Sequence, residues 1–160
     1  MQRVNRILKN RRYKELVARI EELEADRIFC RHNMDHFLDV ARIACLINED
    51  EKTGIPRGII YAASLLHDIG RVSQYEDGTE HETAGVGPAR MILSECGFTD
   101  DETDLIATAI SRHGDESVRD RKDLDGLLYR ADKMSRKCFI CGVRDRCHKP
   151  YEKLVMEIVY

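Results

Sequence analysis

The spacing of apolar residues is the feature that most constrains the fold of this chain. Apolar side chains recur at three- and four-residue steps, which is the spacing of one face of an α-helix. Near the amino terminus one such stripe comprises Val4, Ile7, Leu8, Tyr13, Leu16, Val17, Ile20 and Leu23. Glycine (10) and proline (3) are sparse among 160 residues, so little interrupts long helices. We therefore expect an all-α fold that forms a single globular domain.

The same periodicity, with turn and cap residues at its limits, predicts where the elements lie. Pro56 suits an early helix position, Gly70 suits a C-cap, and Pro88 should bend its helix if it lies beyond the first turn. The expected helices cover one or two stretches within 4–23, then 32–48, 56–69, 81–96, 100–113, 120–136 and 151–160, with a polar loop over 74–80.

Three regions of the one domain follow from these patterns. Residues 1–28 form an amphipathic helical segment that packs on the core, residues 29–137 form the central helical domain, and residues 138–160 form a cysteine-rich segment with a terminal helix. No internal repeat or long linker separates them.

Charge and hydropathy argue against several classes of partner. The net charge of -3 does not favour nucleic acid or an anionic membrane surface. The basic start of the chain and the acidic run Glu21, Glu22, Glu24 and Asp26 are interpreted as the solvated faces of amphipathic helices. The start of the chain has no apolar stretch of signal-peptide length, and the longest apolar run, Ile59 to Leu66, is too short for a bilayer. We expect a cytoplasmic protein whose cysteines are reduced thiols or metal ligands.

Metal-competent side chains interrupt the apolar stripes. His32 and His36 lie one turn apart on the face that continues through Val40, and His113 extends the stripe of Ile106 and Ile110. Buried carboxylates are costly unless they are paired or bound to a cation.

Asp132 lies beside Leu128 on such a stripe, and His67 and Asp68 directly follow the apolar run 59–66. A lone histidine is more often a core residue than a ligand. Several such groups aimed into one interior indicate a divalent metal pair.

These residues resemble the HD superfamily of metal-dependent phosphohydrolases. The matching segments are His36-Phe-Leu-Asp-Val40, Leu65-Leu-His67-Asp68-Ile-Gly70 and Ala131-Asp132-Lys133, in the family's order over residues 30 to 136. The resemblance implies that His36, His67, Asp68 and Asp132 bind one metal and that Asp68 bridges to a second. It further implies that His81 and His113 complete the second site.

The resemblance also suggests roles around the metals. The segment from His32 to Val40 is similar to the His-Asn-x-x-His-x-x-Asp-Val stretch of cyclic nucleotide phosphodiesterases, where the first histidine protonates the leaving oxygen. His32 is therefore a general-acid candidate beside Asp68, or a residue that only hydrogen-bonds backbone at a helix start. Arg71 and Lys133 are candidates for contacts to substrate phosphate, or surface cations.

The implied function is hydrolysis of a phosphate ester or anhydride by metal-activated water, with a nucleotide or related small phosphorylated compound as substrate. The nitrogen and oxygen ligands favour two ions of iron or manganese, with nickel, cobalt, zinc and magnesium as further candidates. The alternatives are a metal-stabilised nucleotide-sensing module without turnover, a di-iron oxygenase, and nucleic-acid binding through the basic amino terminus and the cysteines. The sequence leaves open whether the chain forms homo-oligomers.

A cysteine cluster lies outside the matched segments. Cys138, Cys141, Cys147 and His148 form C-x-x-C-x5-C-H, which could bind a structural zinc, supply three ligands to an iron–sulfur cluster, or remain reduced thiols. Adjacent Cys147 and His148 do not follow the usual zinc-finger separation. Cys45 and Cys96 lie within expected helices, where a buried structural role is the default.

Overall fold

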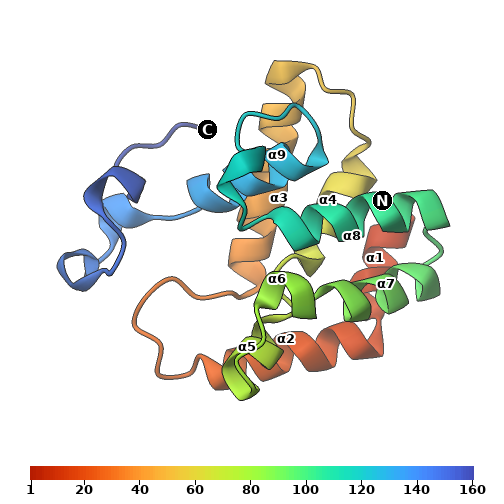
Figure 1. Ribbon diagram of the computed structural model, residues 1–160, viewed down its shortest axis with the longest axis horizontal. Coiled ribbons are helices and arrows are strands. Elements are labelled where there is room, and N and C mark those ends of the chain that lie inside the picture. Colours follow the sequence, from red (N-terminus) through yellow and green to blue (C-terminus); the bar gives the residue numbers. More distant parts are fainter.

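A computed structural model describes all residues, 1–160, and confirms the expected all-α fold, because it contains helices and no strand. The helices form a single domain (Figure 1). The α-helices are α1 (Gln2–Lys9), α2 (Arg11–Leu23), α3 (Met34–Glu51), α4 (Arg57–Leu66), α5 (Arg71–Glu76), α6 (His81–Ala84), α7 (Val86–Glu95), α8 (Asp100–Arg112) and α9 (Leu124–Met134). Short 3-10 helices follow at η1 (Glu116–Val118), η2 (Cys138–Ile140), η3 (Arg144–Arg146) and η4 (Tyr151–Lys153).

The core lies where α3, α4, α8 and α9 pack against one another, with α7 on α8 and the amino-terminal helices along one side. The apolar stripes identified in the sequence supply this core, and Phe37, Leu65 and Ile106 are among its fully buried members. The stripe of α1 and α2 also packs inward, through Ile7, Ile20 and their neighbours. Burial of these faces is the main source of the fold's stability.

Side-chain caps explain where several helices begin. Asn33 accepts a hydrogen bond from the His36 backbone N–H (3.1 Å) and starts α3, while Asp123 accepts from Gly126 (3.2 Å) and starts α9. At α8, Thr99 and Glu102 form a capping box. The cap at Asp123 is also why the helix expected over 120–136 begins only at Leu124.

Three further expectations about elements are wrong. The polar loop expected over 74–80 begins only after Glu76, because α5 extends through the first three of those residues. The helix expected over 81–96 is two helices that meet at Gly85, and Pro88 lies in the first turn of α7, where a missing N–H costs little. The expected terminal helix over 151–160 is only the single turn η4, since its apolar side chains, such as Ile158 and Tyr160, remain exposed and bury no helical face.

Gly70 is needed for close approach and not for a left-handed C-cap. Its φ is -71°, and α4 already ends at Leu66. A Cβ atom at Gly70 would lie 2.1 Å from the His81 carbonyl oxygen and 2.5 Å from the Gly85 backbone nitrogen. The chain after α4 therefore packs directly on the turn that carries His81.

The cysteine-rich segment (138–160) leaves the end of α9 and lies apart from the main helical body (Figure 1). It contains only η2, η3 and η4. None of the helices in the chain combines the length and the apolar character needed to cross a membrane.

Candidate metal centre

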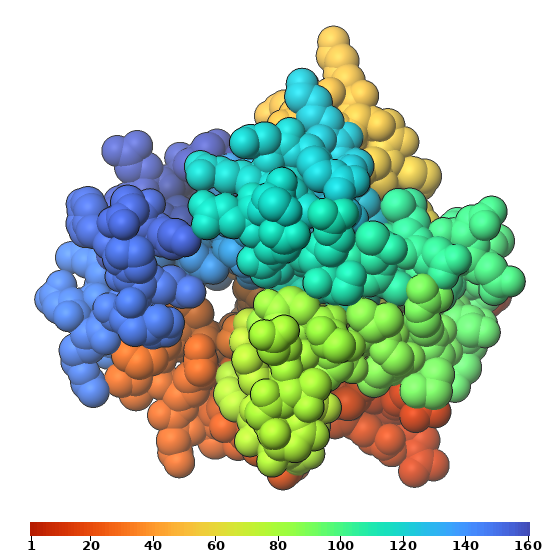
Figure 2. Space-filling view, in the orientation of Figure 1, coloured from red at the N-terminus to blue at the C-terminus, as the bar shows by residue number.

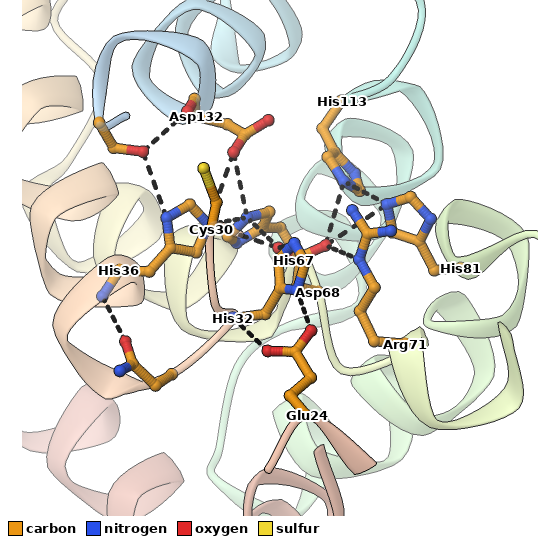
Figure 3. A network of polar contacts seen from close by, with 12 residues as sticks. Glu24, Cys30, His32, His36, His67, Asp68, Arg71, His81, His113 and Asp132 are labelled. Atoms are coloured by element: carbon orange, nitrogen blue, oxygen red, sulfur yellow. Dashed lines mark hydrogen bonds and ion pairs between the residues drawn. The ribbon is translucent and has the colours of Figure 1, made fainter. Parts of the chain in front are cut away.

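The carboxylate of Asp68 lies at the centre of a cluster of imidazoles. It follows α4 and is 1% exposed. Its Oδ2 atom lies 3.0 Å from His67 Nε2 and 3.4 Å from His36 Nε2, whereas Oδ1 lies 3.4 Å from His81 Nε2 and 3.7 Å from His113 Nε2 (Figure 3). One carboxylate therefore faces two separate groups of nitrogen atoms, one with each oxygen.

The first group joins α3, the end of α4 and α9. His36 Nε2 and His67 Nε2 are 3.3 Å apart, and Asp132 Oδ1 lies 3.5 Å from the former and 3.9 Å from the latter. His36, His67 and Asp68 each offer one ligand atom within 4.8 Å of the others, and Asp132 adds a second carboxylate beside the two imidazoles. This donor set suits a divalent transition metal ion.

The second group joins α6 and the end of α8 to the same carboxylate. His81 Nε2 and His113 Nε2 lie 3.2 Å apart, and both face Asp68 Oδ1. The Arg71 Nε–H also donates to Asp68 Oδ1 (2.9 Å), so a fixed cation already balances part of the carboxylate charge.

Hydrogen bonds at Nδ1 turn the Nε2 atoms of three histidines toward the cluster. His67 Nδ1 donates to the Ser64 carbonyl (2.7 Å), and His113 Nδ1 donates to the Ile110 carbonyl (2.7 Å). A carbonyl only accepts, so the proton lies on Nδ1 and the lone pair on Nε2.

His36 follows the same rule, since the Ser135 hydroxyl donates to the Asp132 carbonyl (2.7 Å) and so accepts from His36 Nδ1 (3.2 Å). Facing lone pairs repel one another unless a cation lies between them. Each of the two groups could therefore hold a metal ion.

His81 differs from the other three histidines, because its Nδ1 atom makes no hydrogen bond. Its Nδ1 atom lies 3.0 Å from Glu82 Oε2, but without the alignment of a hydrogen bond. A side chain at Gly114 would meet that carboxylate at 2.2 Å, so the glycine leaves room for Glu82. Neither Glu82 nor Gly114 was predicted from the sequence to belong to the site.

The charge states suit metal ligands. Burial raises the pKa of Asp68, but its charge interactions with His67, His32 and Arg71 outweigh burial and hold the pKa well below its usual range. Burial lowers the pKa of His67, but the charge of Asp68 outweighs burial and raises it, so metal binding at His67 Nε2 must displace a proton. Burial, followed by repulsion from Arg71, lowers the pKa of His81 to about 3. An ionised carboxylate and a neutral imidazole are the forms that bind a metal ion.

His32 lies at the edge of the first group and is held by a residue that sequence reasoning missed. Its Nε2 atom is 3.9 Å from Asp68 Oδ2, while its Nδ1–H donates to Glu24 Oε1 and its backbone N–H donates to Glu24 Oε2 (2.8 Å). The Tyr75 hydroxyl also donates to Glu24 (2.5 Å). These contacts orient the ring so that Nε2 faces the cluster (Figure 3).

The interpretation of Glu24 as part of a solvated acidic face is therefore wrong, because its side chain is 3% exposed. Burial raises the pKa of Glu24, but the hydrogen bonds from His32 and Tyr75 outweigh burial and lower the pKa to about 2. The available signal was position: Glu24 lies four residues after the buried Ile20, on the same helical face.

Arg71 and Lys133, the two candidate phosphate contacts, both line the cavity above the cluster. Each already has an acidic partner, because Arg71 pairs with Asp68 and Lys133 Nζ lies 2.6 Å from Asp132 Oδ2. Lys133 also donates to the His113 carbonyl (3.2 Å). Both side chains therefore orient candidate ligands, and their own contact with substrate stays a prediction.

The cavity has a volume of about 1280 Å³ and reaches from the histidine cluster to the cysteine-rich segment. Figure 2 shows a hollow between that segment and the region of α5 and α6. Eleven arginine and lysine residues line the cavity against seven aspartate and glutamate residues, although the whole chain is slightly acidic. The cavity is thus suited to an anion.

Cys96 is buried, as expected, whereas Cys45 is only half-buried. Among Cys138, Cys141 and Cys147, only Cys138 is buried, and all six cysteines of the chain are free thiols. No three cysteine sulfur atoms lie within 4.8 Å of one another.

Comparison with known proteins agrees with this geometry. A model of the HD domain matches residues 33–137. An uncharacterized protein of Clostridium beijerinckii is 41% identical over 160 residues, which is the whole of both chains. A bifunctional uridylyltransferase/uridylyl-removing enzyme of Rhodopseudomonas palustris is 44% identical over 57 residues, 36% of this chain and 6% of that enzyme. No solved structure matches. With the HD domain covering most of its length, the chain belongs to the HD domain family.

Proposed function

We propose that this protein is a metal-dependent hydrolase of a phosphate ester or anhydride, with a nucleotide or related small phosphorylated compound as its substrate. The observation that carries the proposal is the split contact of Asp68, whose two oxygens face two groups of imidazole nitrogens at the base of a cationic cavity. Membership of the HD domain family supports the same chemistry.

In this proposal His36, His67, Asp68 and Asp132 hold one divalent ion, and Asp68, His81 and His113 hold a second. The mixed nitrogen and oxygen donors favour iron or manganese. When bound, such ions lower the pKa of water and neutralise phosphate oxygens. The chain's own contribution is to hold the ligands in place, through Ser64, Ile110 and Ser135.

His32 is proposed as the proton donor to the leaving oxygen. Its Nδ1–H is committed to Glu24, so Nε2 is the atom that faces the cluster and carries the transferable proton. Glu24 is the positioning residue, since it binds both the ring and the backbone of His32. A proton donor is needed for an alkoxide leaving group, which favours an ester as substrate.

The cations around the cavity support an anionic substrate. Burial lowers the pKa of Lys149, and repulsion from Arg136 and Lys133 lowers it further. The positive charges that line the cavity thus repel one another, and a bound phosphate would reduce that repulsion. Arg71, with its fork of N–H donors, is the group that we expect to contact a phosphate oxygen.

The test is hydrolysis of a panel of nucleotides and phosphoesters by protein loaded with manganese or iron under reducing conditions. Asp68→Ala should abolish activity and lower the bound metal. His32→Ala should reduce turnover by about 100-fold or more, the usual contribution of a general acid, while metal stays bound.

Asp104→Ala is the matched control, because Asp104 lies on the exposed face of α8 and pairs only with Arg90. Full activity in Asp68→Ala would refute the proposal. Silence of a fully metal-loaded wild type across the panel would favour a nucleotide sensor or an oxygenase. Loss of metal from His32→Ala would place His32 among the ligands and refute its role as proton donor.

A further inference from the structure

The outer wall of the cavity is made by two segments that are distant in sequence. One is the loop between α2 and α3, and the other is the cysteine-rich segment (138–160). Four cysteines line this wall: Cys30 from the loop, and Cys138, Cys141 and Cys147 from the segment. The sequence pattern had shown only the last three as a cluster.

One contact, together with the surroundings of its thiol, places Cys30 near the other three cysteines. The rings of Phe29 and His148 meet edge to face, with centroids 6.0 Å apart, so the residues next to Cys30 and Cys147 touch. Although Cys30 is exposed as a residue, burial around its thiol raises its pKa, and like-charge repulsion from Cys138 and Cys141 raises it further. In Figure 3 the Cys30 side chain points away from Glu24, toward the end of the site near α9.

Little else holds the cysteine-rich segment in place. Its helices are single 3-10 turns. Ile140, Tyr151 and Ile158 are 72%, 73% and 75% exposed, and Leu154, Val155 and Met156 are only half-buried. Ordering such a chain costs about 1–2 kcal/mol per residue in backbone entropy, which this burial does not offset. Chains with too little core are commonly held by disulfides or metals, and every cysteine here is a free thiol.

We propose that Cys30, Cys138, Cys141 and Cys147 together bind one iron–sulfur cluster of the [4Fe–4S] type, with one thiolate on each iron. The four thiols release their protons to water on binding, and the cluster is assembled from two ferrous ions, two ferric ions and four sulfide ions, so that no electron transfer is needed. It joins the loop before α3 to the cysteine-rich segment and completes the wall of the cavity. This site is separate from the histidine cluster and does not rest on the proposed hydrolase activity.

The spacing of the thiols favours a cluster over a single zinc ion. Tetrahedral zinc at 2.3 Å from each sulfur holds its ligand sulfurs about 3.8 Å apart. No three of these sulfur atoms lie within 4.8 Å of one another, whereas a cluster spreads its thiolates over four irons. A zinc site also draws ligands from two closely spaced pairs, and only Cys138 and Cys141 form such a pair.

Two of the cysteines end tight turns of the backbone. The backbone N–H of Cys141 donates to the Cys138 carbonyl (3.3 Å) at η2, and that of Cys147 donates to the Arg144 carbonyl (2.9 Å) at η3. Each tight turn ends at a cysteine. His148 contacts Phe29 and is therefore placed as a packing residue and not as a ligand.

The experiment uses the full chain, purified without oxygen and reconstituted with equal amounts of ferrous and ferric iron and with sulfide. Because the histidine cluster can also bind iron, the readouts are acid-labile sulfide and the visible absorption of thiolate-bound clusters. We expect sulfide near the [4Fe–4S] ratio in the wild type and in Asp68→Ala. We expect its loss in Cys30→Ser and in Cys141→Ser, and its retention in Cys45→Ser, whose cysteine lies on α3 away from the wall.

A second measurement distinguishes loss of the cluster from a failure of the variant to fold. Limited proteolysis of Cys30→Ser should cut residues 138–160 faster than in Cys45→Ser, while the helical circular dichroism of the two stays equal. The proposal is overturned by a reconstituted wild type that holds no sulfide, by zinc bound in its place, or by Cys30→Ser that keeps wild-type sulfide. A reconstituted wild type that holds sulfide but hydrolyses no substrate would count against the proposed function alone.

Discussion

Replacing Gly70 by alanine should destabilise the fold and disturb the second ligand group at the same time. The backbone at Gly70 has a φ of -71°, which alanine adopts freely, so any effect comes from the added methyl group. That methyl group would lie 2.1 Å from the His81 carbonyl oxygen and 2.5 Å from the Gly85 backbone nitrogen. Both are backbone atoms, so no side-chain rotation relieves the contact.

The magnitude follows from overpacking. Extra methylene groups in a packed site cost about 1–3 kcal/mol, and two backbone contacts place this variant near 3 kcal/mol. For a chain of this size each kcal/mol lowers the melting temperature by about 2–4 °C, so a fall of about 6–12 °C is expected. The turn that shifts is α6, which carries His81, so occupancy of the second metal position should also fall.

The assay is thermal and urea unfolding of the metal-free protein, followed by metal analysis of the loaded protein. Gly58→Ala is the matched control, because nothing lies within 4 Å of a Cβ atom there and the residue is within α4. That change should be neutral or stabilise by up to about 1 kcal/mol. Equal unfolding midpoints for Gly70→Ala and the wild type would refute the close-approach argument.

Two further predictions concern buried and paired polar groups. The hydroxyl of Tyr13 is buried without a hydrogen-bond partner, so Tyr13→Phe should raise the free energy of unfolding by about 1 kcal/mol in urea titrations, and a loss of stability would reveal a partner for the hydroxyl. The hydrogen bond from Arg3 and that from the Thr99 backbone lower the pKa of Glu102 to about 2, so its stabilising effect is complete above pH 4.5 and is lost as pH falls toward 2. Acid unfolding of Glu102→Gln should therefore change less with pH over this window than that of the wild type, and parallel curves would contradict the assignment.

The helical class of the fold and the main ligand candidates could be predicted from the sequence because both depend on local spacing. A period of 3.6 residues decides which side chains share a face, so His36, His113 and Asp132 could be assigned to buried faces without coordinates. The same reasoning failed where capping and burial decide the outcome: it predicted a terminal helix over 151–160, although too little of that segment is buried to stabilise one.

Only the tertiary structure decided how separate segments meet. Glu24 is buried because His32 and Tyr75, from two other parts of the chain, both bind its carboxylate. The two oxygens of Asp68 face different groups because α3 and α9 lie on one side of it and α6 and α8 on the other. Cys30 joins the other cysteines through a contact between loops. Periodicity predicts which side chains share one face of a helix. The distances between separate segments are set only when those faces pack against one another, so the sequence alone could not show these contacts.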